Sequence, residues 1–291
     1  MPEPLTALPA DTARQIKWVF TDVDDTLTWE GRLPSQTLIA LEQLQQAGIH
    51  VVAVTGACAG WCDHIAKLWP VHTVIGENGA FWMSKRDGQF ITRFASSQAI
   101  MQANQNALKS QIQELLNQYP DIGLAADQPL RFCDVAVNIG QDRPAVDPAI
   151  CADILKNIHA MRVNGQTVHA TQSSIHINAW VGEHSKRVSS EALLGTLSVA
   201  LPSTVSARLS ADLSAAQPPL KANSTPLVYL GDSLNDEAMF EWLPLTIGVA
   251  NIRQSLPNLT HKPTYITRQP GGLGFAEFAD YLLQARQNSD K

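Results

Sequence analysis

Charged residues are scarce in this sequence, and they do not gather in runs. Asp, Glu, Lys and Arg make up 16% of the 291 residues, against about 25% in an average globular chain. The formal net charge is -6, and no cluster of lysines or arginines stands out. We therefore expect neither a nucleic-acid partner nor attachment to an anionic membrane. A phosphorylated ligand would have to be attracted locally, by a metal ion or a lysine.

Long apolar runs and a leader pattern are also missing. No segment approaches the roughly 18 apolar residues of a membrane span, and the N-terminus lacks a basic start followed by an apolar stretch. The four cysteines are scattered, unlike those of a secreted disulfide framework. We expect a cytoplasmic protein, as a monomer or a homodimer.

Apolar segments alternate with helical patterns toward both ends of the chain, which is typical of a parallel sheet covered by helices. The predicted strands are 18–21, 49–54, 74–75, 227–230, 246–249 and 265–266, and the predicted helices are 35–47, 59–69, 185–200 and 275–286. Residues 1–14 contain three prolines and are predicted to form a loose tail, and residues 202–225 a loop-rich segment.

The pattern differs in the middle of the chain. A predicted hairpin over 81–93 is followed by a helix over 97–118, and strands are predicted over 132–139, 168–171 and 174–181. Asp147-Pro148 indicates the start of another helix. We predict an α+β unit over 82–182, inserted into a parallel-sheet core that is built from 15–81 and 183–291. The length of the chain agrees with two domains.

Four polar features follow predicted core strands or begin a helix. They are Asp22–Thr26, Thr55-Gly56, Lys186 and Gly231–Asp236. Ligands of open α/β sheets bind beyond the carboxyl ends of the strands, so these features are expected to meet in one crevice. Each feature alone also has a non-functional interpretation: a solvated strand end, a turn or a surface lysine. The combination favours a functional site.

Crowded carboxylates at this site would repel one another unless a cation or protons neutralised them. Asp22, Asp24, Asp232 and Asp236 offer hard oxygen ligands, which suit Mg²⁺, and no histidine or cysteine lies within these motifs. Together with Lys186, the site is suited to a phosphoryl group.

The spacing of Asp22 and Asp24 indicates two roles. Residues i and i+2 of an extended segment point to the same side. Asp22 can attack phosphorus while Asp24 protonates the leaving oxygen and later deprotonates the attacking water.

The four polar features resemble, in the same order along the chain, the motifs of the haloacid dehalogenase superfamily of aspartyl-phosphate phosphatases. They are Asp22–Thr26, Thr55, Lys186 and Gly231–Asp236. The insert looks like a C2-type cap (subfamily IIB), as in sucrose- and trehalose-phosphate phosphatases and Cof-type hydrolases. Gly76–Ala80 strengthens this likeness, and its Asn78 is a candidate substrate-binding residue. The resemblance covers the chain after about residue 15 and implies a Rossmann-like core with an inserted α+β cap.

The resemblance also implies individual roles. Asp22 is the nucleophile and a metal ligand. Asp24 is the acid/base and binds Mg²⁺ through its backbone carbonyl. Asp232 ligates the metal, while Asn235 and Asp236 order the metal and the lysine.

Thr55 and Lys186 hold the phosphoryl group by the same resemblance. Two positions depart from the family pattern. Asp25 stands where glycine is common, and Ala57 follows Thr55-Gly56 where many relatives have arginine. If that arginine helps to hold the substrate or the cap, this chain must do so differently.

A further hypothesis concerns the substrate. Alternation in two cap strands places Asp134 and Asn138 on one side of the first, and His176 and Asn178 on the same side of the second. The two cap helices can cover the apolar face. We expect the polar face to look toward the active site and to read a leaving group such as a sugar; the alternative is that it meets bulk water.

The expected function is Mg²⁺-dependent hydrolysis of a small phosphorylated metabolite. Two alternatives remain open: phosphoryl transfer to an acceptor other than water, as in a phosphomutase, and a non-catalytic regulatory protein on the same fold.

Overall fold

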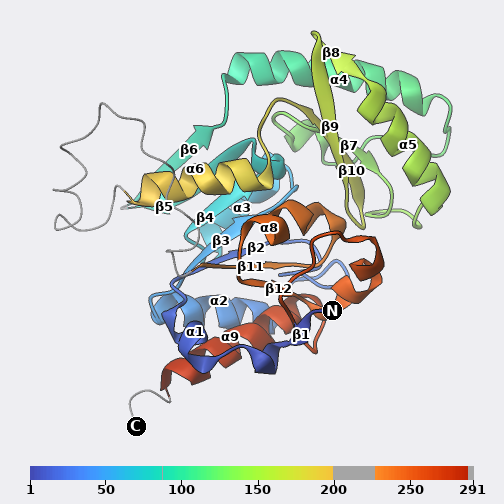
Figure 1. Cartoon of the computed structure of the whole chain (residues 1–291). Helices are drawn as coiled ribbons and strands as arrows, with labels where there is room; N and C mark the ends of the chain where they lie inside the picture. The colour runs from blue at the N-terminus through green and yellow to red at the C-terminus, as the bar shows by residue number, and fades with distance from the viewer. Residues whose placement is uncertain (87, 199–226, 288–291) are drawn as a thin grey trace.

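The computed structural model describes residues 1–86, 88–198 and 227–287. The predicted loop-rich segment over 202–225 lies outside the described residues. The chain forms a parallel-sheet core, in the lower part of Figure 1, and a second α+β unit, in the upper part. The predicted fold class is therefore confirmed.

The core is built around a mixed sheet. Within the described residues its strand order is β1-β13-β12-β11-β2-β3-β4-β5-β6, parallel from β1 to β4 and antiparallel at β5 and β6. The strands are β1 (Glu3–Pro4), β2 (Trp18–Thr21), β3 (His50–Val54), β4 (Thr73–Gly76), β5 (Phe81–Arg86), β6 (Gln89–Phe94), β11 (Leu227–Gly231), β12 (Thr246–Gly248) and β13 (Tyr265–Ile266).

The strand order reverses between β2 and β11. From β2 the chain proceeds outward through β3 and β4, and from β11 it proceeds the opposite way through β12 and β13. Open α/β sheets bind ligands at such a switch point, beyond the carboxyl ends of the strands. The topology therefore directs attention to the segments after β2 and β11.

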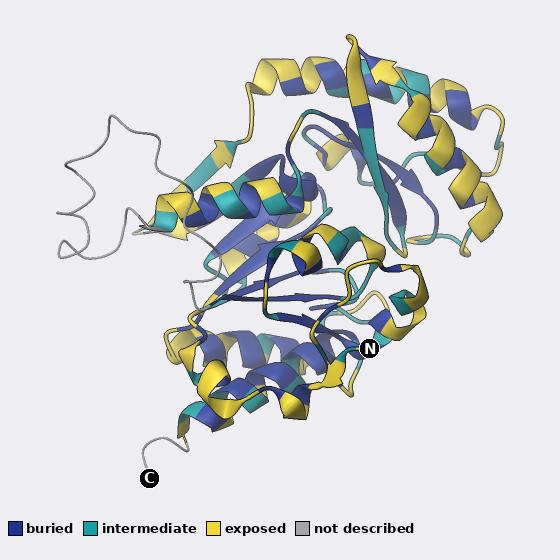
Figure 2. Ribbon diagram, viewed as in Figure 1, coloured by how far each residue is buried: buried dark blue, intermediate teal, exposed yellow. Residues whose placement is uncertain are grey.

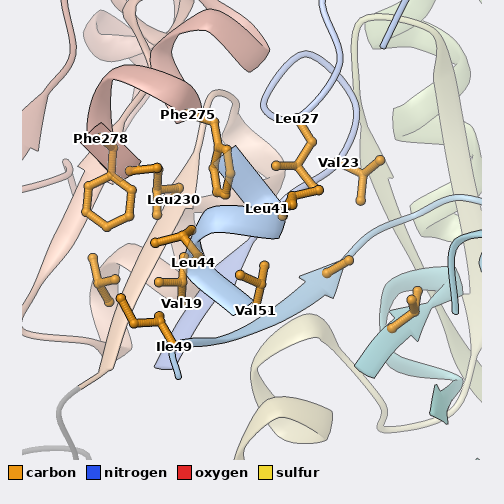
Figure 3. Close-up of a cluster of buried hydrophobic side chains, with 14 of the residues drawn as sticks. Val19, Val23, Leu27, Leu41, Leu44, Ile49, Val51, Leu230, Phe275 and Phe278 are labelled. Atoms are coloured by element: carbon orange, nitrogen blue, oxygen red, sulfur yellow. The ribbon is translucent and has the colours of Figure 1, made fainter. Parts of the chain in front are cut away.

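Helices cover both faces of this sheet because the central strands are apolar on both sides. Val19 and Val51 face α2 and α9, while Phe20 and Val52 face α6 and α8. Figure 3 shows the first of these clusters, in which Phe275 lies with side chains of α2 and the sheet. The helices of the first face are α1 (Ala10–Gln15), α2 (Ser35–Gln46), α3 (Ala59–Leu68) and α9 (Gly271–Gln287), and those of the second are α6 (Lys186–Ser198) and α8 (Glu237–Trp242).

The inserted unit, hereafter the cap, has its own antiparallel sheet and its own core. Its strand order is β7-β10-β9-β8, and α4 and α5 lie against one face. The Asp147 carboxylate accepts a hydrogen bond from the Ala149 N–H and so caps α5, as predicted. The elements are α4 (Gln98–Leu116), β7 (Val135–Asn138), α5 (Pro148–Ala160), β8 (Arg162–Val163), β9 (Gln166–Gln172) and β10 (His176–Val181).

Two differences from the predicted organisation stand out. The hairpin of β5 and β6, which prediction placed in the inserted unit from residue 82, instead extends the core sheet through pairing of β5 with β4. Its apolar residues indicated a hairpin, but which sheet it joins depends on tertiary contacts.

The predicted loose tail over 1–14 is wrong. Residues 3–4 form β1 on the edge of the sheet, and α1 packs on α9. Leu5 and Leu8 are 2% exposed. The three prolines do not loosen this segment because Pro4 lies in an edge strand and Pro9 just before a helix, where proline is tolerated. Figure 2 shows buried residues in these N-terminal elements beside α9.

No helix in the described ranges combines the length and apolar character that crossing a bilayer requires.

The N-terminal segment should contribute measurably to stability. Leu8→Ala is expected to lower the free energy of unfolding by about 2 to 4 kcal/mol, because it removes a fully buried side chain. Ile39→Ala, at a position that is 53% exposed, should change it by less than about 0.5 kcal/mol. Urea unfolding measures both; equal effects would mean that residues 1–8 detach in solution.

Candidate active site

A buried lysine joins two carboxylates at the switch point of the sheet. Lys186, the first residue of α6, donates from Nζ to Asp22 Oδ1 at 2.7 Å and to Asp236 Oδ1 at 2.8 Å. Asp22 directly follows β2, and all three side chains are buried. The two carboxylates raise the pKa of Lys186 against the effect of burial, so the lysine is charged. The structure thus brings together residues that are 164 positions apart, as the sequence predicted.

Asp236 uses both oxygens to order its surroundings. Oδ1 also accepts a hydrogen bond from the Tyr229 hydroxyl, and Oδ2 accepts from the backbone N–H groups of Asp232 and Ser233. This close approach requires Gly231, since a Cβ there would lie 2.5 Å from the Asp236 carboxyl. Asp236 therefore fixes the loop that carries Asp232, in keeping with its predicted ordering role.

Asp232 is oriented by two neighbours. Its Oδ1 accepts a hydrogen bond from the Thr26 hydroxyl at 3.3 Å, and its Oδ2 accepts from Asn251 Nδ2 at 2.9 Å. Asn251 also donates to the Asp25 carbonyl and so ties the loops after β2 and β12 together. Asn251 was not predicted as a site residue, although its position just after a predicted core strand was the available signal.

These carboxylates fit a divalent cation. Oxygen atoms of Asp22, Asp232 and Asp236 lie within 4.8 Å of one another, and the donor set contains only oxygen, which suits Mg²⁺. Burial and the neighbouring carboxylates raise the pKa of Asp22 to about 8 and that of Asp232 well above its usual range. A cation would offset both effects. Asp236 completes this group of carboxylates, and both of its oxygens also accept hydrogen bonds. The predicted contact of the metal with the Asp24 backbone carbonyl stays a prediction.

Asp24 interacts with both the lysine and the Thr55 hydroxyl. Burial and Asp25 raise the pKa of Asp24, while Lys186 and the Thr55 hydroxyl act in the opposite direction. Asp24 is half-buried and Thr55, directly after β3, is fully buried. The Ala57 N–H donates to Thr55 Oγ1 at 3.0 Å, so the loop after β3 curls around the threonine hydroxyl.

Asn78 lies against the same loop, on the segment after β4. Its backbone φ is 55°, a left-handed conformation that asparagine tolerates better than most residues. Its N–H donates to the Thr55 carbonyl, and its Oδ1 accepts from Asn235 Nδ2 at 3.4 Å. Asn78 Nδ2 has no hydrogen-bond partner within the part of the chain that the structure describes. The side chain of Asn235 thus contacts Asn78, and its predicted part in ordering the metal or lysine stays a prediction.

Glu77 clamps the cap to the core, a role that the sequence analysis missed although it quoted the segment. Its carboxylate accepts N–H donors from Ala59 and Phe132 on one oxygen, and from Cys133 and Asp134 on the other. Burial raises the pKa of Glu77 to about 7, which the N–H groups of Phe132 and Cys133 oppose. The start of β7 is thereby fixed relative to α3.

The polar face of the cap does look toward the core. Asn178 Nδ2 donates to the Gly56 carbonyl at 3.3 Å, and the Ser174 hydroxyl donates to Asp25 Oδ2 at 2.8 Å. The alternative that this face meets bulk water is wrong, since Asp134, Asn138, His176 and Asn178 are all buried.

These four cap residues are not equally available to a ligand. Asp134 binds Arg131 and Asn178, while Asn138 accepts from the N–H groups of Gly140 and Gln141 and so shapes its own loop. His176 Nδ1 faces Arg131 Nη2 at 3.4 Å, whereas its Nε2 has no partner. Of the four, only His176 has a buried side-chain polar atom without a hydrogen-bond partner among the described residues.

Arg131 is a third site residue, after Asn251 and Glu77, whose role was not predicted from the sequence. Its guanidinium binds Asp127 and Asp134, and it donates from Nη1 to the Gly56 carbonyl at 3.1 Å. It lies in the irregular segment before β7, where no periodicity distinguishes a buried arginine from a surface one.

The fold defines the class of protein: a Rossmann-like core carrying an inserted cap. Residues 19–122 match the family model of the haloacid dehalogenase-like hydrolases. The predicted resemblance to the haloacid dehalogenase superfamily is thereby confirmed. No curated protein matches the chain.

Several solved structures are similar in fold. The trehalose synthase regulatory protein C-terminal domain of Candida albicans has a TM-score of 0.64 at 15% identity, over 97% of this chain and 98% of that one. A Thermoplasma acidophilum protein has a TM-score of 0.62 at 17% identity, over 92% and 99%. A haloalkanoate-superfamily phosphatase of Bacteroides thetaiotaomicron has a TM-score of 0.53 at 15% identity, over 96% and 98%.

Removing the charge of Glu77 should loosen the attachment of the cap. Glu77→Gln leaves an amide NH₂ facing backbone N–H donors, so the free energy of unfolding should fall by about 2 to 4 kcal/mol. Glu42→Gln, the same change on an exposed face of α2, should have almost no effect. Thermal unfolding of both variants tests this, and equal melting temperatures would contradict the clamp.

Proposed function

We propose that this protein is a Mg²⁺-dependent phosphatase that hydrolyses a small phosphomonoester through an aspartyl-phosphate on Asp22. The observation that carries the proposal is the buried contact of Lys186 with Asp22 and Asp236, beside Asp232 at the carboxyl edge of the sheet. A carboxylate held by a lysine at this position is suited to nucleophilic attack on a phosphoryl group.

The chain's residues supply each part of the reaction. A carboxylate oxygen of Asp22 forms a bond to phosphorus as the ester P–O bond breaks, and the leaving oxygen takes a proton from Asp24. Asp24 then removes a proton from water, whose oxygen attacks phosphorus. The Asp22–phosphorus bond breaks, and inorganic phosphate and the free Asp22 carboxylate are regenerated. Lys186 and Thr55 hold the phosphoryl oxygens.

Mg²⁺ would be held by the carboxylates of Asp22 and Asp232 and by the Asp24 backbone carbonyl. When bound, it would neutralise phosphoryl charge at the acidic cluster. The all-oxygen donor set and the raised pKa values of Asp22 and Asp232 support this cofactor.

The substrate class that we propose is a phosphorylated metabolite with a hydroxyl-bearing leaving group, such as a sugar phosphate. Support comes from the buried polar face of the cap and from the unpartnered nitrogens of Asn78 and His176, which suit a polar group. Four free, buried cysteines agree with the cytoplasmic location that we propose.

A regulatory function is the second candidate, suggested by the fold shared with the C-terminal domain of the Candida albicans trehalose synthase regulatory protein. At 15% identity the likeness concerns the fold alone. The complete set of Asp22, Asp24, Lys186 and Asp232 favours catalysis. Phosphate release that depends on Mg²⁺ would exclude a purely regulatory role, and acceptor alcohols competing with water would identify a phosphotransferase.

Asp22→Asn should abolish turnover of an aryl phosphate, a loss of more than about a thousandfold, because an amide cannot form the aspartyl-phosphate. The fold should persist in circular dichroism. Asp280→Asn, the same change on an exposed position of α9, is the control. Near-normal turnover by Asp22→Asn would refute the covalent mechanism.

Activity should require Mg²⁺ and disappear on treatment with a chelator. Ca²⁺ should inhibit, since it takes more ligands at longer distances and would draw Asp22 into coordination. Phosphate release measured with each ion decides this. Full activity in excess chelator without added metal would be incompatible with the proposal.

A further inference from the structure

The loop after β3 is held by two different parts of the molecule. The Thr55 carbonyl accepts a hydrogen bond from the Asn78 N–H at 3.0 Å, and the Ala57 carbonyl accepts from the Glu77 N–H at 3.2 Å. Both donors belong to the core. The carbonyl between them, that of Gly56, accepts only cap donors among the hydrogen bonds of the described residues: Arg131 Nη1 at 3.1 Å and Asn178 Nδ2 at 3.3 Å.

The direction of the Gly56 carbonyl determines the direction of the next N–H. In a trans peptide, C=O and N–H point to opposite sides of the bond, and the described chain has no cis peptide. With the Gly56 carbonyl turned toward the cap, the Ala57 N–H points toward Thr55 Oγ1, to which it donates at 3.0 Å. That N–H therefore faces the hydroxyl expected to hold the phosphoryl group.

The two cap donors are themselves held rigidly. Asp134, which is fully buried, binds Arg131 at 3.0 Å and accepts from Asn178 Nδ2 at 2.7 Å. Asp127 binds the far side of the guanidinium. Two carboxylates thus offset the single charge of Arg131, so the arginine is suited to orienting a carbonyl and poorly suited to attracting an anion itself.

We propose that the cap completes the phosphoryl-binding site by orienting the Gly56–Ala57 peptide, with Arg131 and Asn178 as positioning residues. The proposal rests on the proposed function, because the Ala57 N–H acts through Thr55 Oγ1, the hydroxyl that the proposed function assigns to the phosphoryl group. The docked cap supplies the hydrogen bonds that fix the Gly56 carbonyl. The core supplies the groups that bind the anion. Cap docking and affinity for phosphate are therefore coupled, whatever leaving group the substrate carries.

This role differs in its consequences from recognition of the leaving group by the same face. Substitution of a residue that recognises the leaving group would change the binding only of substrates that carry that group. A residue that orients the Ala57 N–H affects inorganic phosphate, which has no leaving group. Inorganic phosphate in Mg²⁺ buffer is therefore the discriminating probe.

The experiment compares Asn178→Ala with Asn104→Ala by isothermal titration with inorganic phosphate. Both asparagines are 5% exposed and lie in the cap, but Asn104 accepts a hydrogen bond from Asn164 and makes none to the described residues of the core. Asn178→Ala should weaken phosphate binding roughly five- to tenfold, the effect of losing about one hydrogen bond. Asn104→Ala should leave phosphate affinity unchanged.

A second variant and a kinetic readout separate positioning from damage to the fold. Arg131→Lys keeps the buried positive charge but not the fork that reaches Asp127, Asp134 and Gly56 together. For an aryl phosphate it should raise KM and lower kcat/KM. Loss of folded enzyme alone would lower kcat with KM unchanged, and that pattern, together with unchanged phosphate affinity in Asn178→Ala, would overturn the proposal.

The outcomes also distinguish this inference from the proposed function. Unchanged phosphate affinity in both Asn178→Ala and Arg131→Lys, with a wild type that binds phosphate and hydrolyses aryl phosphates, overturns the inference alone. A wild type that neither binds phosphate nor hydrolyses esters overturns both.

Discussion

The contact of Lys186 with Asp22 and Asp236 organises this molecule. Burying a lysine and two carboxylates is costly unless each charge finds a partner, and here all of them do. Lys186 begins the helix that follows the cap, whereas the two aspartates follow β2 and β11. This cluster therefore connects the part of the core that precedes the cap in the chain with the part that follows it.

The sheet explains why these residues meet. Parallel strands bring all their carboxyl ends to one edge, and the reversal of order at β2 and β11 leaves a crevice there. Residues after β2, β3, β4, β11 and β12 then line a single site. The cap adds the remaining wall through the segment that Glu77 clamps and through the buried polar face of β10.

The core part of the site was predictable from sequence, whereas its connections to the cap were not. Asp22, Thr55 and Asp232 each follow an apolar strand, and the parallel fold places strand ends together. Arg131 had no such signal, because nothing in an irregular segment tells which carbonyl its guanidinium will reach. The structured N-terminus was missed for a related reason: a strand as short as β1 is defined by its neighbour β13 and not by its own pattern.

The short strand β1 also has a consequence for solubility. The Glu3 N–H is directed inward to the Thr264 carbonyl, so the next residue turns its backbone groups outward. That residue is Pro4, which has no N–H to offer. An approaching strand of another molecule therefore lacks a donor at this end of the sheet, and edge-to-edge aggregation is discouraged there. Fusion tags at the N-terminus would join the chain directly beside this protected edge.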